Sequence, residues 1–387
     1  MIAKGINLGG WLLMEGYILG GRNIAEHEFK ARFKKIYGER ELSYFEKSFR
    51  ENFITEEDFK IISSWGARHI RLPFHYKIFE KRPFVYSEES IRFLKKILKW
   101  CEKYNLKVIL DLHAACGSQN QDWHSDSSGK ALLWKNENFR TRSCSLWEYL
   151  AANLKDEEAL YGYDVLNEPV VSKNNINKLK DFYKKTIKAI RSADKKRIIF
   201  LEGNNWAQDI GFLADMISDN TAISIHAYQP LNFTFNFIRN YSYPGMVDGT
   251  LWNKDRMRKY LLPYKKFSSK YKVDIYAGEF GVNYRGNKYG ELVWLRDILD
   301  VFKEFRFGWT YWTHKAVSGG IFPDGIVQYL DNPSWIQRQG PIYGLENLYA
   351  EWKSNKNKII DSWRTRNFNI NYEIVDTLRR HMASGNQ

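Results

Sequence analysis

The sequence predicts an α/β protein in which eight parallel strands alternate with helices and close into a single (β/α)8 TIM barrel. Three observations support this fold class. Eight short apolar runs recur along the 387 residues, amphipathic stretches separate many of them, and polar or aromatic residues end most of the runs. Such alternation is typical of βαβ units and a parallel sheet. A doubly wound open sheet is the alternative, but the first run lacks the Gly-x-Gly-x-x-Gly turn common in that fold.

The predicted strands are short and nearly continuous in apolar residues, as expected for strands that are buried on both faces. They are Gly5–Leu8, Ala67–Leu72, Lys107–Leu112, Gly162–Leu166, Arg197–Leu201, Ala222–Ile225, Val273–Ala277 and Gly308–Trp312.

The predicted helices are amphipathic stretches in which Lys, Arg, Asp and Glu alternate with apolar residues at helical spacing. They are Glu56–Trp65, Ser90–Tyr104, Asn175–Ser192, Leu251–Tyr271 and Leu292–Phe305.

Three stretches exceed ordinary connections: Gly20–Phe53, Ala114–Trp147 and Ala316–Gly340. Each follows the end of a predicted strand. In a barrel, the loops after the strands build the active-site face, so we expect these extended loops to form walls of a cleft. Surface decoration is the alternative.

No stretch rich in Pro, Ser or Gly marks a linker, and the hydrophobic content of 44% can supply a large core. We therefore expect one domain over residues 1–387, with a helical C-terminal extension from about residue 341. The aromatic content of 16% fits a large core, and some of the 14 Trp can also line a sugar cleft.

The formal charge of +14 invites a role in nucleic-acid binding, but Lys and Arg are dispersed over helical patterns. No zinc-finger spacing, RNP-like motif or basic tail is present, so no nucleic-acid partner is expected. No apolar run reaches the roughly 18 residues that span a bilayer. The oligomeric state is not predicted.

Three cysteines without metal-ligand spacing, Cys101, Cys116 and Cys144, favour a reducing compartment. The first predicted strand begins close to Met1, which leaves no room for a signal peptide. We expect a cytoplasmic protein, or a secreted one if an export signal has been removed.

Two glutamates at the ends of apolar runs carry the functional hypothesis. Glu168 ends Tyr163–Glu168, and Glu279 follows Ile275–Gly278. Carboxylates at strand ends would face a cavity at the rim of the barrel, and paired carboxylates are the groups that cleave glycosidic bonds. The alternative assigns both glutamates to helix N-caps or ion pairs, but glutamate is a poor cap and each follows a strand.

Other polar or aromatic residues end further predicted strands and would converge on the same rim. These residues are Arg71, His113, His226, Tyr228 and Trp312. A catalytic metal is not expected, because among the histidines only His113 and His124 share a loop, without zinc-ligand spacing. No phosphate-binding loop or nucleophilic serine motif appears, and no cofactor is expected.

These motifs, in this order, resemble glycoside hydrolase family 5 and, within it, the exo-β-1,3-glucanase-like branch. The resemblance runs from Gly5 to about Lys315. It rests on Gly5–Leu12, Phe53–Phe59, Ile70–Pro73, Asp111–Asn120, Asn167–Pro169, His226–Tyr228, Gly278–Gly281 and Trp309–Lys315.

The resemblance implies retaining hydrolysis, with Glu168 as general acid/base and Glu279 as nucleophile. The acid would need a raised pKa, which the charge of Glu279 would help to provide. Arg71 and Tyr228 would hold Glu279 ionised. The resemblance further implies contacts with substrate: Asn167 with the sugar 2-hydroxyl, His113 and His226 with sugar hydroxyls or the acid, Trp312 under the sugar ring, and Asn120 among the substrate-binding residues.

The segment Gly117–Asn120 resembles exo-acting β-1,3-glucanases and steryl- or flavonoid-glucoside hydrolases more than open-cleft endocellulases. The chain departs from the family pattern at Cys116, at His314 and just beyond Lys315, where an acidic residue is usual. We expect these changes to lie near the glycone pocket and its entrance.

The expected substrate is therefore a β-linked glucoside or short β-glucan, with β-1,3 linkage first. The alternatives are a β-glucosidase for small aglycones, an endo-β-1,4-glucanase or mannanase, a glycolipid β-glucosidase at membrane surfaces, and a sugar-binding protein without turnover. Binding alone does not require an acid/nucleophile pair, which disfavours the last of these.

Overall fold

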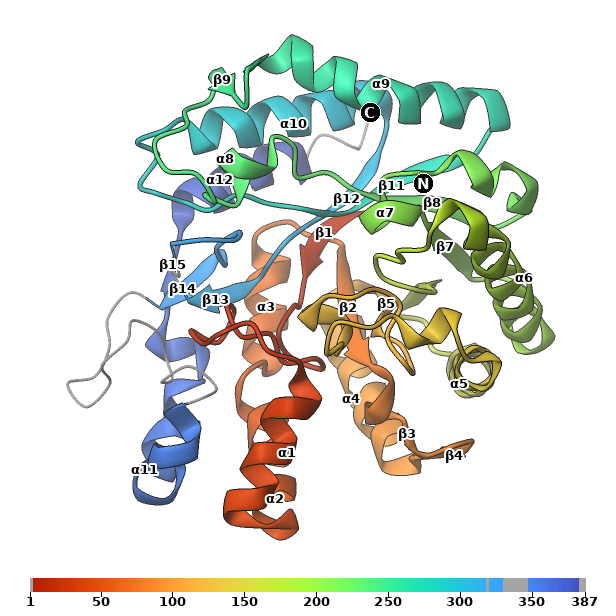
Figure 1. Ribbon diagram of the computed structural model, residues 1–387. Helices are drawn as coiled ribbons and strands as arrows, with labels where there is room; N and C mark the ends of the chain where they lie inside the picture. Colours follow the sequence, from red (N-terminus) through yellow and green to blue (C-terminus); the bar gives the residue numbers. More distant parts are fainter. Residues whose placement is uncertain (1–2, 318–319, 330–346, 383–387) are drawn as a thin grey trace.

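The computed structural model describes residues 3–317, 320–329 and 347–382, and its centre is a closed barrel of eight parallel strands (Figure 1). The strands follow one another around the barrel in chain order: β1 (Lys4–Asn7), β2 (His69–His75), β5 (Lys107–Ala114), β6 (Leu160–Asp164), β7 (Ile198–Glu202), β8 (Thr221–His226), β11 (Asp274–Phe280) and β12 (Gly308–Tyr311). All eight predicted strands are confirmed, with ends shifted by up to a few residues.

Helices form a ring outside the barrel (Figure 1). The five predicted helices are confirmed as α3 (Glu56–Ser64), α4 (Glu88–Lys103), α6 (Ile176–Ala193), α9 (Lys254–Tyr271) and α10 (Glu291–Phe305). In α4 the buried residues Ile91, Leu94, Leu98 and Cys101 fall on one face, as the helical period requires. Within the described residues, no helix is both long and apolar enough to cross a bilayer.

The connection Gly20–Phe53 is not the loop that the sequence analysis expected. It folds into two helices, α1 (Glu26–Tyr37) and α2 (Glu39–Asn52), which meet at Gly38 with φ 86°. Phe29, Phe33 and Phe45 pack their rings together and bury the inner faces of both helices. The second half of Ala114–Trp147 is likewise helical, because α5 (Glu137–Leu154) begins within it.

The C-terminal part contributes α11 (Leu348–Ser362) and α12 (Tyr372–Met382), joined by the short strand β15 (Asn369–Ile370). Helix α11 packs beside α1 and α2, and α12 packs on α10 (Figure 1). A small sheet of β13 (Lys315–Val317), β14 (Val327–Tyr329) and β15 links this part to the last barrel strand. The predicted start of the extension, near residue 341, lies outside the described residues.

The remaining short elements are the hairpins β3 (Glu80–Arg82) with β4 (Val85–Tyr86) and β9 (Gly245–Val247) with β10 (Thr250–Trp252), and the short helices α7 (Asn204–Ala207) and α8 (Leu231–Thr234). One large apolar core joins the strands to the surrounding helices. A smaller cluster that includes Tyr161, Phe200 and Tyr276 fills the end of the barrel remote from the site. All three cysteines are buried and free.

Candidate active site

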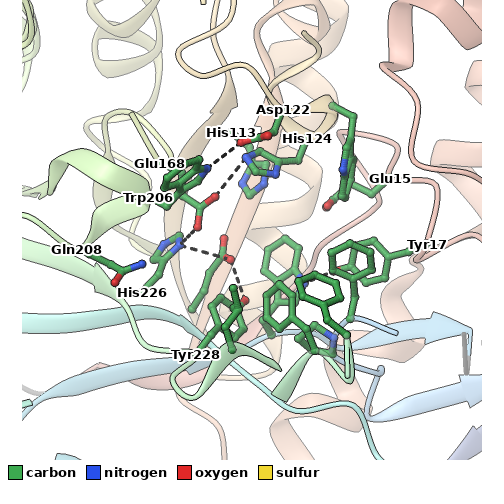
Figure 2. Close-up of a pocket in the computed structure, with 18 of the residues that line it drawn as sticks. Glu15, Tyr17, His113, Asp122, His124, Glu168, Trp206, Gln208, His226 and Tyr228 are labelled. Atoms are coloured by element: carbon green, nitrogen blue, oxygen red, sulfur yellow. Dashed lines mark hydrogen bonds and ion pairs between the residues drawn. The ribbon is translucent and has the colours of Figure 1, made fainter. Parts of the chain in front are cut away.

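A cavity of about 450 Å³ opens at the carboxyl ends of the strands, within the size range of small-molecule sites (Figure 2). Connections after six of the eight barrel strands contribute to it, and Glu279 comes from within β11. The lining residues are Glu15, Tyr17, His113, Asp122, Trp123, His124, Glu168, Trp206, Gln208, His226, Tyr228, Gln229, Leu231, Phe235, Phe237, Glu279, Trp312, Phe322 and Pro323.

The walls of the cavity agree in part with the predicted loops. Asp122, Trp123 and His124 come from Ala114–Trp147, and Phe322 and Pro323 come from the described part of Ala316–Gly340. The first predicted wall is wrong: the lining residues after β1 are Glu15 and Tyr17, which precede the helical segment Gly20–Phe53.

Glu279 is held by two donors at the floor of the cavity. Arg71 Nη1 donates to Oε1 at 2.7 Å, and the hydroxyl of Tyr228 donates to Oε2 at 2.9 Å. A register shift between Ala277 and Glu279 in the pairing of β11 with β8 places the carboxylate at this point. Both donors favour the ionised carboxylate, because each hydrogen bond is stronger to the charged form.

Glu168 points toward the imidazole of His226 (Figure 2), and the same imidazole also reaches Glu279. His226 Nδ1 is 2.6 Å from Glu168 Oε1 and 3.5 Å from Glu279 Oε2. One carboxylate oxygen of each glutamate and a nitrogen of His226 all lie within 4.8 Å of one another. The two carboxylates are therefore close enough to act on the same bond.

The backbone of Glu168 has φ 46°, in the left-handed region that L residues other than Asn, Asp and Gly seldom adopt. Two side chains hold it there. Glu202 Oε2 accepts the Glu168 N–H at 2.6 Å, and Asn120 Nδ2 donates to the Glu168 carbonyl at 2.9 Å. This anchoring fixes where the carboxylate enters the cavity.

The pKa of Glu168 differs from the sequence-based expectation. Burial alone would raise it, but the hydrogen bond from His226 and the charge of that imidazole lower the pKa of Glu168 to about 2. Burial alone would lower the pKa of His226, but the carboxylates of Glu202, Glu279 and Glu168 hold it well above its ordinary value. His226 therefore competes with Glu168 for the proton that the sequence analysis assigned to the glutamate.

A buried charge cluster lies beneath the cavity. The guanidinium of Arg71 contacts four carboxylates, with Asp111, Asp164 and Glu202 at 2.9–3.0 Å in addition to Glu279. Burial and the charge of Glu202 outweigh the attraction of Arg71 and raise the pKa of Asp111 to about 7. Burial likewise raises the pKa of Asp164.

Acidic groups that could hold a metal ion occur twice among the described residues. Asp111, Asp164 and Glu202 form one group, and the guanidinium of Arg71 already occupies the position of the cation there. Glu168, His226 and Glu279 form the other. The absence of a catalytic metal stays a prediction.

The remaining predicted residues surround this pair. His113 donates from Nδ1 to Asp111 at 2.7 Å, and its ring stacks on Trp312 at 5.4 Å. Burial lowers the pKa of His113 to about 3, so the ring is neutral. Asn167 Oδ1 accepts from Arg71 at 2.9 Å. Among the described residues, the cavity lining does not include Arg71, Asn120 or Asn167, which lie directly behind it.

Two of the three departures from the family pattern lie elsewhere than expected. His314 is buried away from the cavity, where Nε2 contacts Asp58 Oδ1 at 2.8 Å. Cys116 lines a second, separate cavity. Neither side chain is among the residues that line the cavity beside Glu168 and Glu279. The position just beyond Lys315 is Ala316, which lies inside β13 and is fully buried.

The sequence analysis missed several residues in and directly behind the cavity lining, although a signal for some was present. Glu15 ends the apolar run Trp11–Met14 and Glu202 ends Ile198–Leu201, as Glu168 and Glu279 end theirs. Glu15 is buried, and its Oε1 has no hydrogen-bond partner in the structure. Trp206 had no comparable signal in the sequence.

Comparisons with known proteins agree with this geometry. A family model described as cellulase (glycosyl hydrolase family 5) matches residues 30–318. A β-xylosidase of Phanerodontia chrysosporium is 28% identical, and the match covers all of this chain and 80% of that protein. Endoglucanase C of Acetivibrio thermocellus is 29% identical over 82% of this chain and 92% of its own length. A probable glucan 1,3-beta-glucosidase A of Emericella nidulans is 29% identical over 58% and 57%.

Solved structures confirm the fold. A crystal structure of a glycoside hydrolase aligns with a TM-score of 0.66 at 20% identity, covering 98% of this chain and 99% of the other. Thermotoga maritima Cel5A in complex with cellobiose aligns with a TM-score of 0.60 at 19% identity, covering 94% and 97%.

Proposed function

The chain belongs to glycosyl hydrolase family 5, and from this premise we propose that it is a retaining β-glycosidase with Glu279 as nucleophile and Glu168 as acid/base. The observation that carries the proposal is the closeness of the two carboxylates: one oxygen of each lies within 4.8 Å of the other, and both reach the same nitrogen of His226. Retaining enzymes hold their carboxyl groups about 5–5.5 Å apart, whereas inverting enzymes need about 6.5–9.5 Å to admit a water molecule.

In the first step, a carboxylate oxygen of Glu279 attacks the anomeric carbon while the glycosidic C–O bond breaks and Glu168 protonates the leaving oxygen. In the second step, water attacks the glycosyl ester, gives its proton to Glu168 and releases Glu279. Arg71 and Tyr228 support the nucleophile by holding its two carboxylate oxygens with hydrogen bonds.

The proton for the first step is already present in the pair of His226 and Glu168. A sugar that enters the cavity expels water, and an ion pair without water is less favourable than the neutral pair. Substrate binding therefore favours transfer of the proton from His226 to Glu168. Glu168 would therefore become protonated, and able to act as the acid, when the substrate binds.

The glycone subsite is expected beside Trp312, with the predicted contacts from His113, Asn167, His226 and Asn120. Glu15 is a further candidate for binding sugar hydroxyls, because its unpartnered Oε1 belongs to a side chain that lines the cavity.

Exo action is supported by an aromatic cluster beside Trp312. Tyr17 accepts a hydrogen bond from the Trp312 indole and packs on Phe322 at 4.9 Å and Trp123 at 5.8 Å. These rings come from three different connections and line the cavity next to the proposed glycone position. A wall of packed rings at this position would favour removal of single sugars from a chain end, and we propose a β-1,3-glucan oligosaccharide as the first substrate.

A second candidate is a β-glucoside with a small apolar aglycone. The cavity includes the exposed side chains of Trp206, Leu231 and Phe237, which are 42%, 37% and 45% exposed. An apolar aglycone would remove this surface from water, which is favourable at about 25 cal/mol per Å².

A timed product analysis tests these proposals, using laminaripentaose and cellopentaose with the Glu279→Gln variant as blank. Stepwise glucose from laminaripentaose supports the exo-β-1,3 proposal. Products of mixed length, or activity confined to cellopentaose, would move the enzyme to an endo or β-1,4 type. Proton NMR of the first-formed sugar tests retention, since an α anomer would contradict it. Faster turnover of an aryl β-glucoside than of either pentaose would favour the second candidate.

A further inference from the structure

His124 contacts the oxygen of Glu168 that His226 leaves open (Figure 2). His124 Nε2 lies 3.2 Å from Glu168 Oε2, whereas His226 binds Oε1. The His124 side chain is 16% exposed and lines the cavity, so it stands where a leaving group would approach. The two carboxylate oxygens of Glu168 therefore contact different imidazoles, Oε1 that of His226 and Oε2 that of His124.

Asn120 determines which form of His124 fits this position. The Asn120 Oδ1 accepts the backbone N–H of Asp122 at 2.9 Å, and Nδ2 donates to the Glu168 carbonyl at 2.9 Å. These two bonds fix the orientation of the amide. The Nδ2 group also lies 3.0 Å from His124 Nε2, so it presents an N–H to that nitrogen. Nε2 must then be the acceptor, with the ring proton on Nδ1.

An unprotonated Nε2 of His124 beside Oε2 favours the protonated form of Glu168 over the ionised form. An ionised carboxylate would place two lone pairs 3.2 Å apart, whereas a protonated Oε2 donates a hydrogen bond to the ring. We propose that His124, whose Nε2 is kept as a hydrogen-bond acceptor by Asn120, is a positioning residue that stabilises the protonated form of Glu168 against the pull of His226. The proposal rests on the acid/base role proposed above for Glu168.

The other charged groups around Glu168 include some that favour its ionised form and some that oppose it. His226 favours the ionised carboxylate, and the positive charge of a protonated His124 would act in the same direction. The acceptor form of His124 that Asn120 selects does not carry that charge. The negative charges of Glu202 and Glu279, which both contact His226, oppose ionisation of Glu168. His113 is neutral, and Asp122 is engaged with the Trp206 indole at 2.8 Å. His124 thus adds a contribution opposite to that of His226, from the side of the leaving group. A glycosidic oxygen that enters the site replaces His124 as the acceptor of this proton.

The tautomer can be measured in the unmodified protein. Nitrogen-15 NMR of histidine-labelled enzyme at neutral pH, assigned with the His124→Ala variant, should show an unprotonated Nε2 and a protonated Nδ1 for His124. A doubly protonated ring, or a proton on Nε2, would overturn the proposal, and neither outcome depends on how the variant folds.

The kinetic test uses the His124→Ala variant and the pH dependence of kcat/KM. Loss of His124 should lower the pKa of Glu168 and move the basic limb to lower pH by roughly one unit, the effect of one hydrogen bond. The rate on phenyl glycosides should fall at least tenfold, while 2,4-dinitrophenyl glycosides, which need no protonation, should lose less than threefold. A basic limb that stays or moves upward, or an equal loss on both substrates, would contradict the proposal.

His27→Ala is the matched control, because His27 bonds Asp126 and Ser128 of the same connection without contacting Glu168. The His27→Ala variant should leave the basic limb of the pH profile of kcat/KM unchanged. The sugar is chosen as whichever aryl β-glycoside the unmodified enzyme hydrolyses best. If none is hydrolysed, the proposed function fails; if one is hydrolysed but His124→Ala leaves its profile unchanged, only this inference fails.

Discussion

Arg71 Nη1 donates to Glu279 Oε1 at 2.7 Å from a guanidinium that has no exposure to solvent. The same side chain contacts Asp111, Asp164 and Glu202, so the proposed nucleophile is joined to a charge cluster inside the barrel. The charge at the floor of the cavity and the stability of the fold therefore both depend on Arg71.

Arg71→Met should destabilise the protein strongly. Removing the cation leaves several buried carboxylates without their partner, which costs about 3–5 kcal/mol in comparable cases. Urea unfolding would measure the change. Arg258→Met is the matched control, because Arg258 pairs with Glu304 at 2.9 Å on the surface and is 44% exposed. It should cost less than about 1 kcal/mol. Equal effects of the two variants would contradict the proposed importance of the cluster.

Glu168→Ala should separate substrates by their leaving groups. Without its acid, the enzyme should lose about 10²–10⁴ in rate on phenyl glycosides and much less on 2,4-dinitrophenyl glycosides. Azide should accelerate the variant on the activated substrate and yield a β-glycosyl azide, because it replaces water without needing a base. The exposed Glu137→Ala variant should behave like the unmodified enzyme. An α-glycosyl azide would argue against a covalent intermediate.

The barrel could be predicted because each strand is a short apolar run, and burial on both faces leaves few other uses for such a run. The helices α1 and α2 were missed although Phe29 and Phe33, and Phe45 and Phe49, show the spacing of four residues typical of a buried helical face. The length of the connection after a strand was interpreted as a loop, and Gly38 interrupts the helical pattern in its middle.

The two glutamates could be predicted because a carboxylate that ends an apolar run has few positions available except a rim. The pKa of Glu168 could not be predicted from the sequence. Whether Glu168 lies nearer to Glu279 or to His226 depends on distances between separate strands, and the imidazole at 2.6 Å reversed the expected direction of its pKa. His314 shows the same limit, since the direction of a side chain just beyond a strand depends on partners such as Asp58, far away in sequence.

Trp206→Ala should weaken binding of longer substrates. The indole is 42% exposed at the cavity, and Asp122 Oδ2 holds its N–H at 2.8 Å. Losing this apolar surface should raise KM for an oligosaccharide about tenfold, equivalent to roughly 1–2 kcal/mol of contact. Trp206→Phe keeps a ring without the bond to Asp122 and should show an intermediate effect. Unchanged KM values for both variants would remove Trp206 from the substrate contacts.

Lys315 should make the stability depend on pH in the alkaline range. Its Nζ is fully buried and donates to the carbonyls of Phe53 and Trp363 and to the Thr365 hydroxyl. Burial, partly offset by the charge of Asp58, lowers the pKa of Lys315 from 10.5 to about 8. Between these two values the unfolded chain binds more protons than the folded one, so the contribution of Lys315 to stability rises with pH, by roughly 3 kcal/mol over the full interval.

The measurement is the difference in unfolding free energy between the unmodified protein and Lys315→Met, at pH 7 and at pH 10. Taking the difference cancels the titration of groups common to both proteins, such as the tyrosines. The difference should shift in favour of the unmodified protein by about 2 kcal/mol or more as the pH rises. For Lys99→Met, at a position that is 67% exposed, it should stay constant. A difference that shrinks with rising pH would mean that the folded protein holds the Lys315 proton more tightly than the unfolded chain does, and that the charge of Asp58 outweighs burial.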